Sequence, residues 1–192
     1  MQQALFEPAA LALPIAGLRY EPGFLEVQDE AALLEWIGTL PLEEARYKAY
    51  TARRRVASFG SRYDFDTNRS QPADPVPSTV FPLRERLGAW AGIAPAALVN
   101  LLVAEYRPGT PLGWHRDVPE HELVVGLSLG GPARMGFRRY PPQQPRKADV
   151  LTLDLAPRSI YLLSEEARWE WQHSIAPTPS LRWSLTFRTR RA

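Results

Sequence analysis

The pattern of hydrophobic and polar positions changes near residue 99, from helical spacing to short alternating runs. Between Asp29 and Leu40, apolar residues recur every three or four positions, which predicts a helix with Asp29 as its cap. Leu83 and Leu87 are four residues apart and predict a second helix over Leu83 to Trp90. The first half of the chain is therefore expected to supply helices.

Short segments rich in β-branched and aromatic residues follow, separated by Gly, Pro, Asp or Ser. The predicted strands are Val99–Tyr106, Leu123–Leu129, Ala133–Tyr140, Val150–Leu155, Ser159–Leu163, Trp169–Ile175 and Arg182–Arg190. Short strands at such close spacing favour a sandwich or jelly roll. At 192 residues the chain suits one domain. We expect a mainly β (α+β) domain over 1–192, with helical support in 1–98 and the β-core in 99–192.

Composition narrows the chemistry, because the chain has no cysteine. Disulfides, thiolate metal sites and cysteine nucleophiles are excluded, and a cytoplasmic location is expected. Any metal must be held by histidine and carboxylate, and the three histidines are His115, His121 and His173. The apolar stretch 9–18 is too short to cross a bilayer, so no membrane partner is expected. Arginine dominates the basic residues and suits phosphate, but codon preference explains it equally well.

His115 and Asp117 are two residues apart, so on an extended strand their side chains share one face. His173 lies on another predicted strand. Two histidines and a carboxylate on a β-core form the ligand set of non-haem iron(II) oxygenases, which leaves coordination positions open. A histidine like His173, taken alone, would more simply be a structural residue. His121 followed by Glu122 lacks the second histidine of a zinc protease motif.

The last predicted strand alternates polar and apolar residues from Arg182 to Arg188. Both arginines share one face with Ser184 and Thr186, and the apolar residues between them share the other. The two arginine Cα atoms would be roughly 20 Å apart, which leaves room for a small dicarboxylate between the side chains. Periodicity alone leaves open whether this polar face lines a cavity or meets water.

Three blocks in this order resemble the AlkB family of Fe(II)/2-oxoglutarate-dependent dioxygenases, which are nucleic-acid demethylases. The blocks are residues 106–117, 171–175 and 182–188. The resemblance covers most of 99–190 and implies a double-stranded β-helix (jelly roll) with N-terminal helices and a nucleotide-recognition lid. It implies that Fe(II) is bound by His115, Asp117 and His173.

The same resemblance implies that 2-oxoglutarate is bound by Arg182 at its distal carboxylate, with help from Tyr106 and Ser184, and by Arg188 nearer the metal. Family members commonly carry asparagine two residues before the tyrosine, where this chain has Ala104. Cofactor geometry at this end is therefore expected to differ slightly.

The family builds its lid in the region of Phe59 to Phe65, where aromatic and basic residues are interleaved. Arg62 and Tyr63 are the predicted contacts to an extruded base and its phosphates, with Glu120 as a further candidate. A plain hairpin whose aromatic residues complete the core is an equally good interpretation, and a solvated surface residue is the simpler one for Glu120.

The implied activity is oxidative demethylation of N-alkylated bases in DNA or RNA, releasing succinate, carbon dioxide and formaldehyde. The expected partner is alkylated single- or double-stranded nucleic acid, and the expected state is a monomer. Two alternatives stay open: an oxygenase of this family acting on protein, lipid or another small molecule, and a jelly-roll binding module without catalysis.

Overall fold

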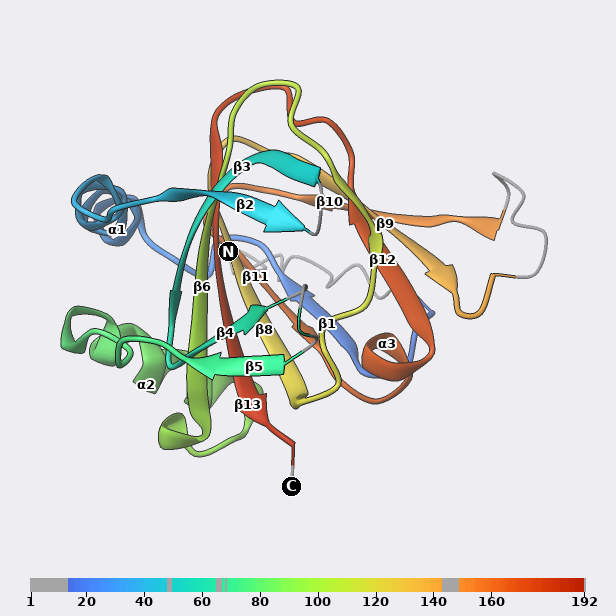
Figure 1. Cartoon of the computed structure of the whole chain (residues 1–192), viewed down its shortest axis with the longest axis horizontal. Coiled ribbons are helices and arrows are strands. Elements are labelled where there is room, and N and C mark those ends of the chain that lie inside the picture. Colours follow the sequence, from blue (N-terminus) through green and yellow to red (C-terminus); the bar gives the residue numbers. More distant parts are fainter. Residues whose placement is uncertain (1–13, 48–49, 65–66, 68, 143–148, 192) are drawn as a thin grey trace, which may run out of the picture.

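The computed structural model describes residues 14–47, 50–64, 67, 69–142 and 149–191. Two antiparallel sheets dominate it (Figure 1). The larger sheet has the strand order β1-β11-β8-β13-β6-β3-β2. Its strands are β1 (Leu18–Glu21), β2 (Glu43–Tyr47), β3 (Tyr50–Phe59), β6 (Leu98–Tyr106), β8 (His121–Gly130), β11 (Ser159–Leu163) and β13 (Arg182–Arg190).

The smaller sheet has the order β10-β9-β12-β7. Its strands are β7 (Leu112–His115), β9 (Ala133–Arg139), β10 (Leu151–Leu155) and β12 (Trp171–Ile175). A separate hairpin pairs β4 (Ser61–Asp64) with β5 (Arg69–Pro72). The helices are α1 (Val27–Gly38), α2 (Phe81–Ala91) and α3 (Glu165–Trp169), with 3₁₀ turns at Ser78–Val80 and Pro95–Ala97. The expected mainly β, jelly-roll fold is confirmed.

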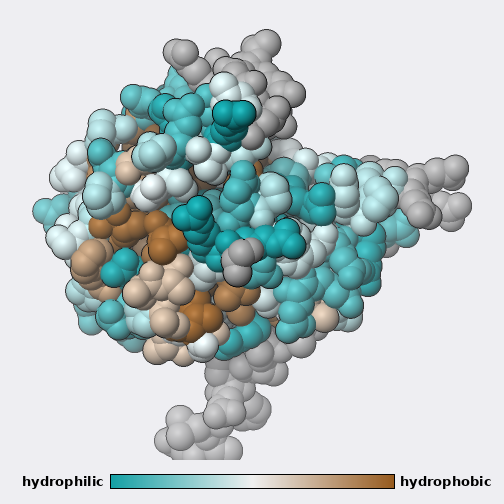
Figure 2. All heavy atoms as spheres, turned by 60° about the horizontal axis from the view of Figure 1, so that its bottom comes forward, coloured by the Kyte–Doolittle hydropathy of each residue, from teal (hydrophilic) through white to brown (hydrophobic). Residues whose placement is uncertain are grey.

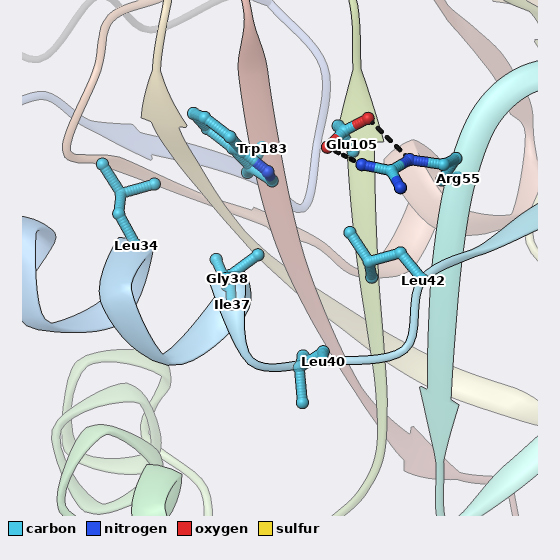
Figure 3. Close-up of a pocket in the computed structure, with 8 residues that line it drawn as sticks. All are labelled: Leu34, Ile37, Gly38, Leu40, Leu42, Arg55, Glu105 and Trp183. Carbon is cyan, nitrogen blue, oxygen red and sulfur yellow. Dashed lines mark hydrogen bonds and ion pairs between the residues drawn. The ribbon is translucent and has the colours of Figure 1, made fainter.

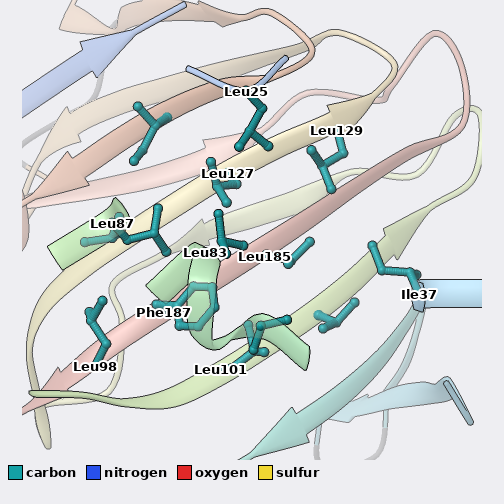
Figure 4. Close-up of a cluster of buried hydrophobic side chains, with 14 of the residues drawn as sticks. Leu25, Ile37, Leu83, Leu87, Leu98, Leu101, Leu127, Leu129, Leu185 and Phe187 are labelled. Carbon is teal, nitrogen blue, oxygen red and sulfur yellow. The ribbon is translucent and has the colours of Figure 1, made fainter. Parts of the chain in front are cut away.

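Apolar side chains form two clusters on opposite faces of the larger sheet. The first lies between that sheet and the two long helices (Figure 4), where Leu87 of α2 and Ile37 of α1 meet Leu127, Leu185 and other strand residues. The second lies between the sheets and contains Ala104, Tyr106, Phe137, Met135 and Leu155 among others. Alternation along each strand sends successive side chains to these two layers.

Both predicted helices are present within two residues of their expected bounds. Asp29 does not cap α1 in the expected way: the helix begins at Val27, and Asp29 accepts from the backbone N–H of Glu26 at 3.3 Å. Asp29 therefore acts from within the first turn, where a carboxylate can bond back to the cap residue.

The β-structure is not confined to 99–192, because β1, β2 and β3 belong to the larger sheet. Three consecutive arginines in β3 interrupt the alternation of polar and apolar residues, so periodicity does not reveal this strand. The expected strand over 169–175 is also divided: α3 ends at Trp169 and β12 begins at Trp171.

The surface is largely hydrophilic on the face drawn in Figure 2, with a hydrophobic area on the side where α1 and α2 lie. Three exposed apolar residues belong to these helices or to the strand after α2: Val27, Phe81 and Val99. Across the described ranges, no helix combines the length and apolar character that crossing a membrane requires.

Candidate active site

A cavity of about 1340 Å³ lies between the two sheets and extends to the β4–β5 hairpin. Its lining includes nearly every predicted site residue: Arg62, Tyr63, Tyr106, His115, Asp117, His173, Arg182, Ser184 and Arg188. Glu120 is not among the lining residues; it lies in the turn before β8, and its carbonyl accepts from the Arg191 N–H. The fold thus brings together residues that are up to 126 positions apart (188 − 62).

Three side chains converge at one end of this cavity. His115 ends β7 and lies directly opposite His173 of β12 in the antiparallel register. Asp117 follows two residues after β7 ends, so it lies on the loop rather than on the strand. The Nε2 atom of His173 is 3.6 Å from Oδ2 of Asp117, and the two imidazole centroids are 4.2 Å apart. One ligand atom from each residue lies within 4.8 Å of the others.

The surroundings of His115 and His173 favour the neutral imidazole, the form that binds a metal. The carbonyl of Gly113 can only accept, so Nδ1 of His115, 2.8 Å away, donates to it and leaves Nε2 with a lone pair. Burial lowers the pKa of His173 to about 3, with repulsion from His115 adding to the effect. Burial also lowers the pKa of His115. Neither imidazole is protonated at neutral pH, which is the state a metal requires.

Asp117 is held as a carboxylate by a neighbouring arginine. Nε of Arg188 donates to Oδ1 of Asp117 at 2.7 Å, and Nη1 donates to the side-chain oxygen of Asn100 at 3.1 Å. Burial would raise the pKa of Asp117, but the charge of Arg188 outweighs it, with help from the histidines, and the pKa is strongly lowered. Oδ2 remains directed toward His173.

Asn100 also lines the cavity, and the sequence analysis did not identify it. Its amide nitrogen donates to the carbonyls of Phe59 and Ser61, at 3.2 and 2.8 Å, and its oxygen accepts from Arg188. Asn100 therefore connects the arginine beside the metal ligands to the turn that begins the β4–β5 hairpin. Gly60, at the centre of that turn, has φ +82°, and a Cβ there would collide with the Val99 carbonyl.

Arg182 begins β13, six positions before Arg188, and is 1% exposed. Its Nε donates to the Ser128 hydroxyl at 2.9 Å, and its guanidinium carbon lies 4.9 Å from the centroid of the Tyr106 ring. Nη1 of Arg182 is buried, and among the described residues it has no hydrogen-bond partner. A buried cation with an unpaired donor destabilises the fold unless an anion accepts a hydrogen bond from that donor.

Tyr106 and Ser184 lie beside this arginine. Burial would raise the pKa of Tyr106, but the charges of Arg54 and Arg182, with hydrogen bonds to Arg54 and Ser184, outweigh it and lower the pKa. The β13 face predicted to be polar lines the cavity, whereas Leu185 and Phe187 on the other face join the apolar cluster under the helices. The open question about this strand is answered in favour of the cavity.

A family model described as 2OG-Fe(II) oxygenase superfamily matches residues 17–189. The chain belongs to this superfamily. A solved structure of OsALKBH1 has the same fold, with a TM-score of 0.70 at 16% identity, covering 90% of this chain and 98% of that one.

Curated relatives carry the AlkB name. The alkylated DNA repair protein ALKBH8 homolog of Arabidopsis thaliana is 32% identical over 184 residues, covering 85% of this chain and 51% of that protein. The tRNA (carboxymethyluridine(34)-5-O)-methyltransferase ALKBH8 of Mus musculus is 25% identical over 173 residues, covering 86% and 25%. The chain thus spans about half, or a quarter, of the length of these relatives. The resemblance to the AlkB family is confirmed.

Iron(II) and 2-oxoglutarate are therefore the cofactors of this dioxygenase, and the residues present fit both. Two neutral imidazoles and a carboxylate form a possible metal site, and it is the one such cluster among the residues that the structure describes. The unpaired Nη1 of buried Arg182 fits the distal carboxylate of a dicarboxylic acid. Arg188 lies beside the metal ligands through its bond to Asp117, and its contact with 2-oxoglutarate stays a prediction.

The predicted substrate contacts lie at the hairpin. Arg62 is exposed and Tyr63 half-buried on β4, and both line the cavity. Phe59 lines the cavity but also packs against the apolar cluster under the helices, as the plain-hairpin interpretation expected. Phe65 lies outside the described residues.

Proposed function

We propose that this oxygenase removes an N-alkyl group from a base of DNA or RNA. The observation that carries the proposal is the extent of the cavity. About 1340 Å³ exceeds the 300–1000 Å³ of ordinary small-ligand pockets and far exceeds what 2-oxoglutarate requires. The space continues from His115 and His173 to Arg62 and Tyr63, where a flat base could stack on the tyrosine.

The names of the relatives support the same substrate class, since one is named for repair of alkylated DNA and another for tRNA modification. Arg62, which lines the cavity, adds an electrostatic reason for a nucleic-acid substrate. Arg62 is exposed and can meet a phosphate, so binding should weaken as salt rises. The proposed partner is alkylated nucleic acid, single- or double-stranded, whose target nucleotide is unpaired or extruded. The proposed location of the enzyme is the cytoplasm.

The proposed reaction couples the oxidative decarboxylation of 2-oxoglutarate to demethylation of the base. One oxygen atom of O₂ enters succinate as 2-oxoglutarate loses carbon dioxide, and the other is inserted into a C–H bond of an N-methyl group. The resulting hydroxymethyl group loses its hydroxyl proton to the base nitrogen, the N–C bond breaks, and formaldehyde leaves. Bound iron would supply the activation of oxygen.

The chain itself positions the reactants. His115, Asp117 and His173 would hold the metal with three ligands, and such a ligand set would leave positions for the keto acid and oxygen. Arg188 keeps Asp117 ionised and oriented, and Arg182 offers its unpaired donor to the distal carboxylate. The half-buried ring of Tyr63 would hold the base at the far end of the cavity.

The test is to incubate the pure protein with Fe(II), 2-oxoglutarate and N-methylated single-stranded DNA and RNA, and to measure oligonucleotide mass. We expect loss of the methyl group and stoichiometric succinate and formaldehyde from at least one polymer. The His173→Ala protein is the matched control and should yield neither product. Succinate formation that no oligonucleotide stimulates, with unchanged masses, would overturn the nucleic-acid proposal and leave the cofactor assignment standing.

A further inference from the structure

A second guanidinium reaches the cofactor end of the cavity from β3. In the antiparallel pairing of β3 with β6, Arg55 lies opposite Glu105 and Val56 opposite Ala104. Arg55 turns to the helix side of the sheet, where its Nη2 is 2.7 Å from Glu105 (Figure 3). Because neighbouring side chains on a strand alternate, Arg54 turns to the cavity side, and it is one of the residues that line the cavity.

Arg54 lies against the same tyrosine as Arg182. It forms a side-chain hydrogen bond with Tyr106, and its charge lowers the pKa of that hydroxyl together with the charge of Arg182. Its Nε is buried and has no hydrogen-bond partner among the described residues, like Nη1 of Arg182. Two buried guanidinium groups that contact one tyrosine, each with an unpaired donor, favour an anion site over a structural ion pair.

Neither Asp117 nor Glu105 supplies the anion for Arg54. The buried carboxylate at the metal end, Asp117, is already bound by Arg188, and Glu105 faces the other side of the sheet. Ala104, where a polar residue was expected, adds only a methyl group to the cavity wall. A carboxylate has about four acceptor sites, so it can take donors from two arginines and a tyrosine at once.

We propose that Arg54 binds the distal carboxylate of 2-oxoglutarate jointly with Arg182, with the Tyr106 hydroxyl between them. The proposal rests on the cofactor assignment and not on the nucleic-acid substrate. Arg54 replaces the polar contact that Ala104 cannot make, and does so from a different strand.

The test compares two keto acids by isothermal titration calorimetry on Mn(II)-loaded protein without nucleic acid. 2-Oxopentanoate has the same metal-binding end as 2-oxoglutarate but carries a methyl group in place of the distal carboxylate. Arg54→Gln should weaken 2-oxoglutarate binding by about tenfold or more, the usual effect of losing a hydrogen bond to a charged group. It should leave 2-oxopentanoate unchanged, and Arg54→Lys should restore part of the loss.

Arg53→Gln is the matched control, since it removes one charge from the adjacent exposed position and should leave both affinities unchanged. Equal weakening of both keto acids by Arg54→Gln would mean that Arg54 only supports the fold, and the proposal would be wrong. Unchanged 2-oxoglutarate affinity with weaker oligonucleotide binding would assign Arg54 to the nucleic acid and overturn it equally. A failure of demethylation itself would not affect this experiment.

Discussion

The two ends of the cavity are built differently. At the cofactor end, the charged side chains of Asp117 and Arg182 are buried. The pairing of β13 with β6 positions Arg182, and the bond from Arg188 holds Asp117. At the substrate end, the β4–β5 hairpin is a separate two-stranded sheet whose β5 residues are all exposed. Isolated two-stranded hairpins are marginally stable, so the hairpin depends on contacts such as those of Asn100.

This difference follows from the chemistry at each end. Metal and keto acid require donors held in one geometry, and burial within a sheet supplies that rigidity. The proposed substrate, a base on a polymer, must enter and leave, which favours an exposed element with few fixed contacts. We therefore expect substitutions at the cofactor end to act on ligand affinity without nucleic acid, and those at the hairpin to act on nucleic acid alone.

The largest effect is expected for His173→Ala, which removes a metal ligand. Mn(II) or Fe(II) affinity should fall by more than the roughly 10- to 100-fold typical of losing a supporting contact, and turnover should stop. His121→Ala is the control, because His121 is buried in the same cavity but lies outside the ligand cluster. Equal loss of metal in both proteins, measured by calorimetry, would contradict the ligand set.

Arg182→Ala should have the next largest effect. Removing one partner of a buried charge pair typically costs about 2–5 kcal/mol, so 2-oxoglutarate affinity should collapse while oligonucleotide affinity stays near the wild-type value. Arg134→Ala is a control on β9, since this exposed arginine pairs with Asp154. Circular dichroism must show a folded protein, and wild-type 2-oxoglutarate affinity in that protein would rule out the assignment.

Arg188→Gln tests whether Arg188 orients the metal ligand Asp117 or binds 2-oxoglutarate. Because Arg188 donates to Asp117, its loss should lower metal affinity by roughly 10- to 100-fold, as outer contacts of metal ligands do. Arg190→Gln, at an exposed position on the same strand, should leave metal affinity unchanged. If metal affinity is retained and only 2-oxoglutarate binding falls, Arg188 is a cofactor ligand and not an orienting group.

Tyr63→Ala should have the smallest and most selective effect. Base stacking is worth roughly 1–3 kcal/mol, so demethylation of oligonucleotides should weaken while the slow conversion of 2-oxoglutarate without substrate continues. Tyr63→Phe keeps the ring and should retain most activity. Loss of both reactions together with the circular dichroism signal would show that Tyr63 is part of the core, and the comparison between the two ends would fail.

The sequence predicted the cofactor end better than the substrate end, for physical reasons. His115, His173 and the β13 arginines lie on strands whose alternation assigns their faces, whereas Asp117, expected on the same strand as His115, lies on the loop after β7. The role of Asn100 was missed, although a polar amide in the apolar run 98–104 was a signal for a buried hydrogen-bond network. Its partners lie about 40 residues away, so no local pattern identifies them.

The role of Arg54 could not be predicted from the sequence. It lies within three consecutive arginines, where alternation gives no contrast between faces. Only the register that pairs Arg55 with Glu105 decides that Arg54 faces the cavity. Residues whose role depends on strand pairing across 50 positions cannot be assigned from spacing alone.

The most direct test of the central claim is a crystal structure grown without oxygen in the presence of Mn(II) and 2-oxoglutarate. We predict an anomalous scattering peak at bonding distance from His115, Asp117 and His173, with the keto acid on the same ion. The distal carboxylate should accept a hydrogen bond from Nη1 of Arg182. A metal bound elsewhere, or a keto acid whose distal carboxylate avoids Arg182, would contradict the account.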